Sequence, residues 1–132
     1  MLKDFFDTLN SRGFLNQSTD EEGIKKLLKQ KTIGYIGFDC TSDSLHVGSL
    51  LPLMLLRNFQ KHGHKPIILV GGGTTLIGDP SGKDETRKIL SVEDINKNKK
   101  KLKAIFTKFL SFDKNEENCA ELVDNYEWLG KL

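Results

Sequence analysis

Apolar and polar positions along the chain follow two different spacings, which predict helices and strands in alternation. In four segments the apolar residues recur every three or four positions, as they do on one face of a helix: 4–12, 19–29, 45–62 and 91–110. Three short apolar runs predict buried strands: 33–38, 66–70 and 120–123. Because strand, helix and strand follow one another, the pattern predicts a βαβ arrangement with parallel strands.

Residues that begin and end helices stand at the matching points. Thr19, followed three residues later by Glu22, has the spacing of a capping box, so Thr19 is predicted to cap the second helix. Gly13 and Gly63 end the first and third helical patterns. Pro52 lies inside the third pattern, so we expect it in the first turn, where a missing N–H is tolerated.

Composition narrows the class of protein. The 132 residues are 37% hydrophobic and 29% charged, which is typical of a globular domain and argues against disorder. The formal net charge of +2 is too balanced to indicate a nucleic-acid or membrane partner. No apolar run approaches ~20 residues, so we expect no membrane association. Two cysteines make no disulfide framework, which favours a reducing, cytoplasmic location.

Three strands with their helices make only the first half of a doubly wound sheet. We therefore expect an α/β fold, with a Rossmann-like parallel sheet and flanking helices. In such folds the ligand lies at the point where the second half of the sheet begins beside the first strand. A chain ending at Leu132 would leave strand 33–38 as an exposed apolar edge. Either another chain covers this edge or these residues are a fragment of a longer protein, and we favour the fragment.

A polar segment joins the first strand to the third helix. The start of a helix attracts phosphate through its unpaired N–H groups and its dipole. Thr41 and His46 can donate to phosphate oxygens, and Asp39 can hold a ribose hydroxyl or an ammonium group. Gly37 and Gly48 let a purine or ribose approach the backbone. The alternative, an ordinary helix cap with an incidental surface histidine, is disfavoured because these residue types occur together.

A glycine-rich segment, 71–87, follows the second strand and is expected at the same edge of the sheet. It lacks the dinucleotide fingerprint, whose sixth position holds Leu76, and it has one residue too few for a Walker loop. Lys83 and Arg87 are four positions apart and are expected to grip a departing pyrophosphate. Asp79 precedes a proline and would by itself read as a turn former.

Other features carry weaker signals. His62 and His64 have the residue types of a metal site, but no close third ligand, so a surface turn is expected. Cys40 has no assigned base and is expected to be passive. One lysine run is expected to be mainly a solvated helix face, with contact to a nucleic-acid backbone as the alternative: Lys97, Lys99, Lys100, Lys101 and Lys103.

The polar segment resembles the class I aminoacyl-tRNA synthetases, whose His-Ile-Gly-His signature stands here as His46-Val-Gly-Ser49. The stretches 35–46 and 71–83, with Asn125-Tyr-Glu-Trp128, resemble bacterial-type tyrosyl-tRNA synthetases in particular. The resemblance spans essentially all 132 residues. It implies that residues 1–132 are the N-terminal portion of the nucleotide-binding catalytic domain, with 1–31 as a helical extension packed on it.

The resemblance implies ATP-dependent activation of tyrosine to tyrosyl-adenylate, followed by transfer to tRNA(Tyr). It implies ATP as a substrate, Mg²⁺ arriving with the nucleotide, no tightly bound metal, and a homodimer for the full-length protein. The second half of the family's site is absent from these residues, so we expect the 132-residue piece alone to be inactive.

The family's functional positions are carried over residue by residue. Those expected to act on the phosphates during catalysis are Thr41, His46, Lys83 and Arg87. Those expected to bind ATP are Gly37, Asp39, His46, Gly48 and Ser49. Those expected to bind tyrosine are Tyr35, Thr74, Asp79 and Asn125.

Two departures from the family pattern, and two rival interpretations, stay open. Ser49 replaces the last histidine of the signature, so we expect an altered nucleotide contact, and Cys40 stands where proline is common. One rival is a nucleotidyltransferase with a similar His-x-Gly element, although the six residues between Asp39 and His46 favour a synthetase. The other is a catalytically silent, truncated nucleotide-binding module that docks on a partner through its open sheet edge.

Overall fold

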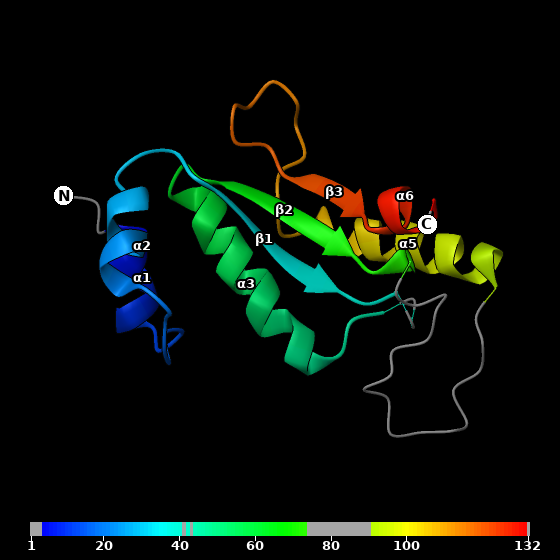
Figure 1. Ribbon diagram of the computed structural model, residues 1–132, viewed down its shortest axis with the longest axis horizontal. Coiled ribbons are helices and arrows are strands. Elements are labelled where there is room, and N and C mark those ends of the chain that lie inside the picture. The colour runs from blue at the N-terminus through cyan, green and yellow to red at the C-terminus, as the bar shows by residue number, and fades with distance from the viewer. Residues whose placement is uncertain (1–3, 41, 43, 74–90, 132) are drawn as a thin grey trace.

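The computed structural model describes residues 4–40, 42, 44–73 and 91–131. Its helices and strands alternate as the sequence pattern predicts (Figure 1). The helices are α1 (Phe5–Ser11), α2 (Glu21–Leu27), α3 (Val47–Lys61), α5 (Val92–Phe106) and α6 (Tyr126–Leu129). The strands are β1 (Ile33–Phe38), β2 (Lys65–Val70) and β3 (Glu121–Asp124).

The three strands form one parallel sheet in the order β1-β2-β3. Tyr35 lies opposite Ile67, and Leu69 lies opposite Val123, so the register is continuous across the sheet. The predicted α/β fold is therefore confirmed. β2 begins one residue before its predicted start, and β3 is shifted by one residue toward the C-terminus.

Helices α3 and α5 pack on the same face of the sheet. This face carries the even-numbered strand residues: Phe38 contacts Phe106 of α5, with ring centroids 5.2 Å apart, and Gly34 faces Phe59 of α3. The main core combines strand and helix residues: Phe38, Cys40, Leu53, Leu56, Ile68, Val70, Ile95, Leu102, Phe106, Leu110 and Ala120. The amphipathic patterns of 45–62 and 91–110 thus describe the two helices that cover the sheet.

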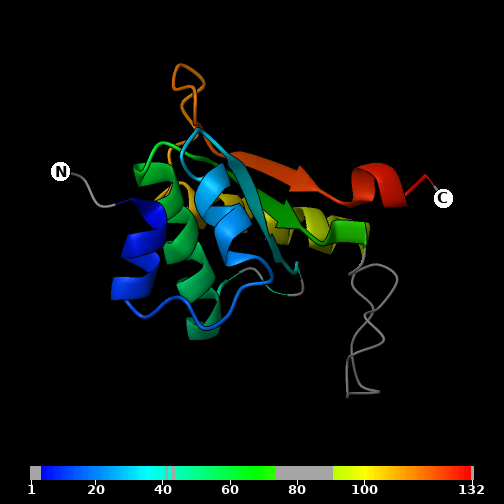
Figure 2. The same cartoon turned by 60° about the vertical axis from the view of Figure 1, so that its left-hand side comes forward.

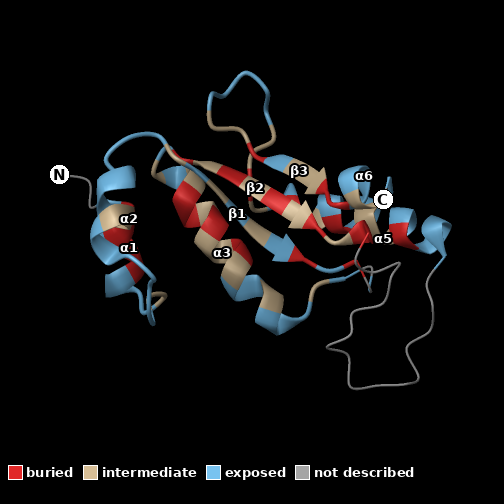
Figure 3. Ribbon diagram, in the orientation of Figure 1, coloured by how far each residue is buried: buried red, intermediate tan, exposed pale blue. Residues whose placement is uncertain are grey.

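The opposite face of β1 is open, so the prediction of a buried strand at 33–38 is wrong for that face, whereas the expectation of an exposed apolar edge agrees with it. Ile33 and Tyr35 are 61% and 69% exposed, and β1 lies at the edge of the described sheet (Figure 3). Among the described residues no helix covers this face. β2, in the centre, is better protected, because it has a strand on each side.

Helix α1 packs on the outer side of α3. Phe5 makes an edge-to-face contact with Phe59, with ring centroids 5.1 Å apart, and the Oγ1 of Thr8 lies 3.1 Å from Nε2 of His62. His64 stacks on Phe59 and accepts the N–H of Thr32 on Nδ1. The predicted surface turn is wrong for His64, which is only 4% exposed, because α1 and α3 together enclose it.

Two predictions of helix starts are also wrong. Asp20, not Thr19, caps α2 by accepting the N–H of Gly23, since a carboxylate both accepts and complements the positive end of the helix. Helix α3 begins at Val47, so Pro52 lies in the second turn and not in the first. Among the described residues, no helix is long and apolar enough to cross a membrane.

Candidate active site

The carboxyl ends of the three strands form one rim, where the described starts of the two predicted polar segments lie side by side. The N–H of Gly71 donates to the carbonyl of Phe38 at 2.9 Å, and the N–H of Asn125 donates to the carbonyl of Val70 at 3.0 Å. Helix α3 returns antiparallel to the strands, so its N-terminal end lies at the same end of the molecule (Figures 1 and 2). The rim therefore combines three strand ends with a helix start, the arrangement at which parallel α/β proteins bind ligands.

His46 is the N-cap of α3, and its imidazole has a defined orientation. Nδ1 accepts the N–H of Gly48 at 3.0 Å. A nitrogen that accepts a hydrogen bond carries no proton, so the neutral ring holds its proton on Nε2. His46 thus caps the helix with one nitrogen and can donate with the other.

Gly48 and Ser49 lie directly against this imidazole. A side chain at position 48 would place its Cβ 2.8 Å from Cε1 of His46, so any larger residue would displace the ring. The Oγ of Ser49 lies 3.4 Å from Nε2 of His46, at the long limit of a hydrogen bond. Ser49 therefore neighbours the donor atom of His46 in this structure.

The open face of the sheet leads up to the rim. Tyr35 points to this face from β1, and Gly37 lies on the same face. Among the described residues, a Cβ at position 37 would meet only the carbonyl oxygen of Leu69, at 4.0 Å. Gly37 thus leaves a bare patch between Tyr35 and the rim, next to the half-buried Leu69. Asp39 follows β1 and is exposed.

A buried carboxylate ties β3 to the glycine segment that leaves β2. Asp124 is 6% exposed, and its Oδ1 accepts the N–H of Gly72 at 3.1 Å and that of Tyr126 at 3.0 Å. Its Oδ2 pairs with Nζ of Lys99, 3.0 Å away. Asp124 thereby holds together the ends of β2 and β3 and the side of α5.

Asn125 continues this arrangement. Its Oδ1 accepts the N–H of Gly73 at 2.8 Å, so its oxygen is directed toward the glycine segment. A contact with a ligand through this side chain would use the NH₂ group as a donor or the second lone pair of Oδ1 as an acceptor.

Sequence reasoning missed Asp124, Lys99 and the apolar residues beside Gly37. Lys99 was expected on a solvated helix face, and this is wrong, because its ammonium group reaches the buried Asp124. The sequence does contain a signal for Asp124, because this acidic residue directly follows the third apolar run, 120–123. The end of a parallel strand is where side chains reach the rim. Strand alternation and register would also have placed Ile67, Leu69 and Val123 beside Tyr35 and Gly37.

Cys40 lies beneath the rim. It is fully buried, and its carbonyl accepts the Nδ2 of Asn98 at 2.9 Å. Burial, reinforced by the negative charges of Asp124 and Asp39, raises the pKa of the thiol to about 11. A thiol that stays protonated at neutral pH is a poor nucleophile, which agrees with the passive role expected for Cys40.

Five of the predicted site residues lie outside the described residues: Thr41, Thr74, Asp79, Lys83 and Arg87. The structure brings the other predicted residues to two places: His46, Gly48 and Ser49 at the start of α3, and Tyr35, Gly37, Asp39 and Asn125 along or just beyond the strands. Within the described part of the chain, no group of three His, Cys, Asp or Glu side chains could hold a metal ion.

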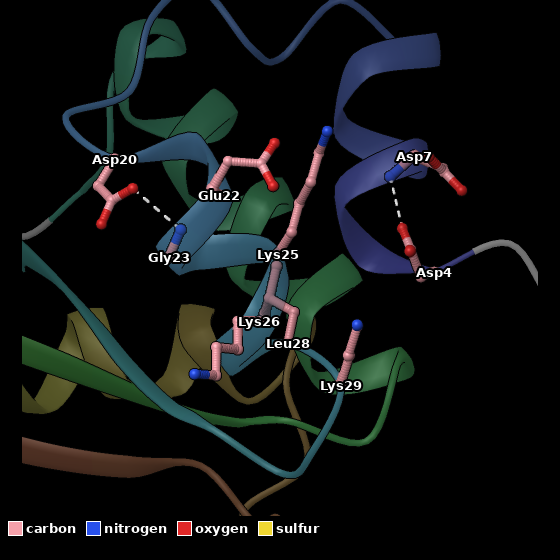
Figure 4. A pocket seen from close by; sticks show the side chains of 9 residues that line it. All are labelled: Asp4, Asp7, Asp20, Glu22, Gly23, Lys25, Lys26, Leu28 and Lys29. Atoms are coloured by element: carbon pink, nitrogen blue, oxygen red, sulfur yellow. Dashed lines mark hydrogen bonds between the residues drawn. The ribbon is translucent and has the colours of Figure 1, made fainter.

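An open depression of about 810 Å³ lies between α1 and α2, at the other end of the molecule from the rim (Figures 1 and 4). Asp4 and Asp20 point into it, but each carboxylate already caps its own helix by accepting an N–H (Figure 4). Lys25 is paired with Glu21 at 3.1 Å. Asp4, Asp20 and Lys25 are therefore used in local contacts, and the depression lies away from the strand ends (Figure 1).

Comparisons with known proteins agree with the geometry. Residues 26–132 match the family described as tRNA synthetases class I (W and Y). The chain is 56% identical over 132 residues to a tyrosine–tRNA ligase of Pelagibacter ubique, covering 99% of this chain and 31% of that protein. It is 52% identical over 128 residues to a tyrosine–tRNA ligase of Clostridium tetani, covering 96% of this chain and again 31% of the relative.

Among solved structures, a C-terminally truncated mitochondrial tyrosyl-tRNA synthetase of Aspergillus nidulans superposes with a TM-score of 0.76 at 26% identity. The match covers 98% of this chain and 39% of that one. The chain thus spans about a third of the length of the relatives that it matches.

Proposed function

The chain belongs to the tRNA synthetases class I (W and Y), and we propose that it supplies the first half of the active site of a tyrosine–tRNA ligase. The observation that carries this proposal is that the His46 helix cap lies at the same end of the molecule as the strand ends and the Asp124–Asn125 pair (Figures 1 and 2). The names of relatives that are 56% and 52% identical favour tyrosine as the amino acid.

The first step joins tyrosine to ATP. The tyrosine carboxylate attacks the α-phosphorus, a new carboxyl-oxygen-to-phosphorus bond forms, and the bond to the oxygen shared with the β-phosphate breaks. Pyrophosphate leaves with the electron pair. A carboxylate needs no base, so the protein contributes by positioning the two substrates and stabilising the charge that develops on the phosphates.

His46 suits this task because its protonated Nε2 can donate to a phosphate oxygen while Nδ1 keeps the ring fixed. A donor that is already oriented costs no reorganisation during the reaction. By family resemblance Thr41, Lys83 and Arg87 act on the same phosphates, with Mg²⁺ arriving as part of the ATP substrate. Gly48 would leave room for the adenosine.

Tyrosine would lie over the bare patch at Gly37. Tyr35 stands on one side of this patch, and the rim with Asn125 stands at its end. By resemblance the Tyr35 hydroxyl meets the substrate phenol, Asp79 receives the ammonium group, and Thr74 and Asn125 line the pocket. Ser49, with Asp39, would contact the ribose.

The second step and the partners belong to the whole protein. The tyrosyl group would pass to the 3′ end of tRNA(Tyr), releasing AMP, in a homodimer located in the cytosol. The open face beside Tyr35 is where the remainder of the site would be added. We expect the 132-residue chain alone not to activate tyrosine, because half of the pocket is open to water.

A chimaera tests the proposal. The 132 residues replace the matching segment of the Pelagibacter ubique relative, and tyrosine-dependent exchange of pyrophosphate into ATP is measured. We expect exchange with the chimaera and none with the 132-residue chain. Absence of exchange in a folded chimaera would contradict the proposed function.

His46→Ala and His46→Ser separate the two roles of the imidazole. Both variants lose the Nε2 donor, so we expect exchange to slow about a hundredfold or more in both, with little change in tyrosine affinity. Serine still caps a helix, so only His46→Ala should also lower stability, by about 1 kcal/mol. A large loss of tyrosine affinity with unchanged turnover would exclude the phosphate role.

A further inference from the structure

Positive charge is concentrated in one segment of the chain. Residues 95–112 hold six lysines and no acidic residue, although the whole chain has a formal charge of only +2. The other 114 residues carry 14 basic against 18 acidic side chains, a formal charge of −4. This segregation marks α5 and the turn after it as a distinct basic surface on a slightly acidic molecule.

Helix α5 has a buried apolar face and an exposed face that carries most of its lysines. Ile95, Leu102 and Phe106 are buried against the sheet, and Lys99 turns to the side to pair with Asp124. The other four lysines of α5 are exposed, and three of them follow one another at intervals of three residues: Lys97, Lys100 and Lys103. Figure 3 shows exposed residues recurring along α5 between the buried ones. Among the described residues, none forms an ion pair with these three.

The spacing of the three lysines, which we call the α5 lysine ridge, makes them neighbours. Residues three apart on a helix have Cβ atoms about 5–6 Å apart. At ~1.5 Å per residue, the ridge from Lys97 to Lys103 is about 9 Å long. The acidic residues of α5, Glu93 and Asp94, are confined to its first turn, and Asp94 belongs to the capping box with Ser91.

The ridge begins near the candidate active site. Asn98, next to Lys97, donates to the carbonyl of Cys40 beneath the rim, and Lys99 reaches Asp124 at the end of β3. A polymer held along the ridge would therefore have one part close to the strand ends.

We propose that the α5 lysine ridge binds the phosphate backbone of RNA. Closely spaced ammonium groups match a row of phosphates, and binding releases the counterions that the phosphates had condensed. A membrane surface fits less well, because a helix lying on lipid turns its large apolar residues into the bilayer, whereas α5 buries them against the sheet. The identification of this RNA as tRNA rests on the proposed function, but the backbone contact does not.

The test compares two matched triple variants of the 132-residue chain. Lys97, Lys100 and Lys103 are changed to glutamine in the first, and the exposed Lys26, Lys29 and Lys61 are changed to glutamine in the second. Fluorescence anisotropy measures the affinity for a tRNA(Tyr) transcript between 50 and 200 mM salt, roughly the range over which phosphate contacts weaken most clearly. Circular dichroism checks that both variants keep the helical content of the parent chain.

We expect the ridge variant to bind about tenfold more weakly at low salt, and its slope of log affinity against log salt to fall by about 3. The control variant should lose much less. Equal losses in the two variants, no RNA binding by the parent chain at low salt, or tighter binding to phosphatidylserine vesicles than to RNA would each overturn the proposal.

The chimaera separates this proposal from the proposed function. The ridge variant should raise KM for tRNA in aminoacylation and leave tyrosine-dependent pyrophosphate exchange unchanged, because exchange needs no RNA. A chimaera without exchange would refute the ligase function while leaving RNA binding by the ridge intact. Exchange together with unchanged RNA affinity in the ridge variant would refute the ridge alone.

Discussion

The two cysteines differ in chemistry because their surroundings differ. Cys40 is fully buried and its thiol has a pKa of about 11, whereas Cys119 is partly exposed beside Nζ of Lys65. The thiolate attacks the disulfide of Ellman's reagent and releases its thiolate half, so at pH 8 we expect Cys119 to react and Cys40 to react only when the chain unfolds. In a Cys119→Ser variant, reaction as fast as in urea would contradict the buried position of Cys40.

His64 should make stability depend on pH. Burial, with a smaller effect from His62, lowers the pKa of His64 below its usual value of 6.5. The unfolded chain then binds the proton more readily than the native chain, so this contribution to stability is complete above pH 6.5 and is lost as pH falls below it. Protonation at Nδ1 would also break the hydrogen bond from the Thr32 N–H.

Urea denaturation at several pH values measures the effect of His64. We expect the free energy of unfolding to fall between pH 6.5 and pH 5 in the parent chain. His64→Gln cannot titrate but can still accept from Thr32, so it should show a weaker pH dependence. An unchanged pH dependence in this variant would assign the effect to other groups.

Residue types alone could not predict these environments. His64 was expected in a surface turn because it and His62 have no close third metal ligand in the sequence. It is buried because Phe5, almost sixty positions earlier, closes over it together with Phe59. The role of Asp124 depends in the same way on Lys99 and Gly72, which only the folded chain brings to it.

At the scale of elements, the rim requires glycine where the strand ends approach one another. A Cβ at position 72 would overlap the carboxylate of Asp124, which is held by three partners and cannot turn away. We expect Gly72→Ala to lower the free energy of unfolding by about 1–3 kcal/mol, the usual cost of overpacking.

Gly37→Ala is the matched control. Its Cβ would have open space, so we expect stability within about 0.5 kcal/mol of the parent, or slightly higher because alanine reduces the freedom of the unfolded chain. Thermal or urea unfolding of the two variants provides the measurement. Equal costs at positions 37 and 72 would show that the Asp124 contact does not constrain the rim.

Element types and order followed from the spacing of apolar residues, but helix starts did not. Val47 is the first residue of α3, two positions later than predicted, because the His46 side chain itself takes the capping position. Asp20 replaces Thr19 as the cap of α2 for a similar local reason. Both outcomes depend on competition between adjacent polar side chains, which a hydrophobic pattern does not resolve.

At the scale of the whole molecule, the sheet has one covered face and one open face. The sequence pattern predicted the parallel sheet and an exposed first strand, since three strands and two crossover helices cover one side only. It could not show which residues of 33–38 face water, because apolar residues and glycines fill both faces of β1. The exposed candidates for the tyrosine pocket, Tyr35 and Gly37, lie on that open face.

The open edge at β1 should make the isolated chain self-associate. Ile33 and Tyr35 are exposed there, and no strand in the described part of the chain pairs with the outer edge of β1, a combination that natural sheets usually protect. We expect light scattering of the 132-residue chain to show a mass that rises with concentration. Tyr35→Lys should reduce this rise, because a charged side chain on an edge strand opposes pairing with another chain.

Leu27→Lys is the control, since Leu27 is 54% exposed on α2, away from the edge. It should leave the rise in mass with concentration almost unchanged.

The form of the association also separates two interpretations of the chain, a half-site of a larger enzyme and a docking module. Open-ended growth that Tyr35→Lys reduces is expected of a half-site whose sheet is continued by further strands. A dimer of fixed mass would instead favour the docking module that uses the open sheet edge, and Tyr35→Lys would then dissociate this dimer whereas Leu27→Lys would not.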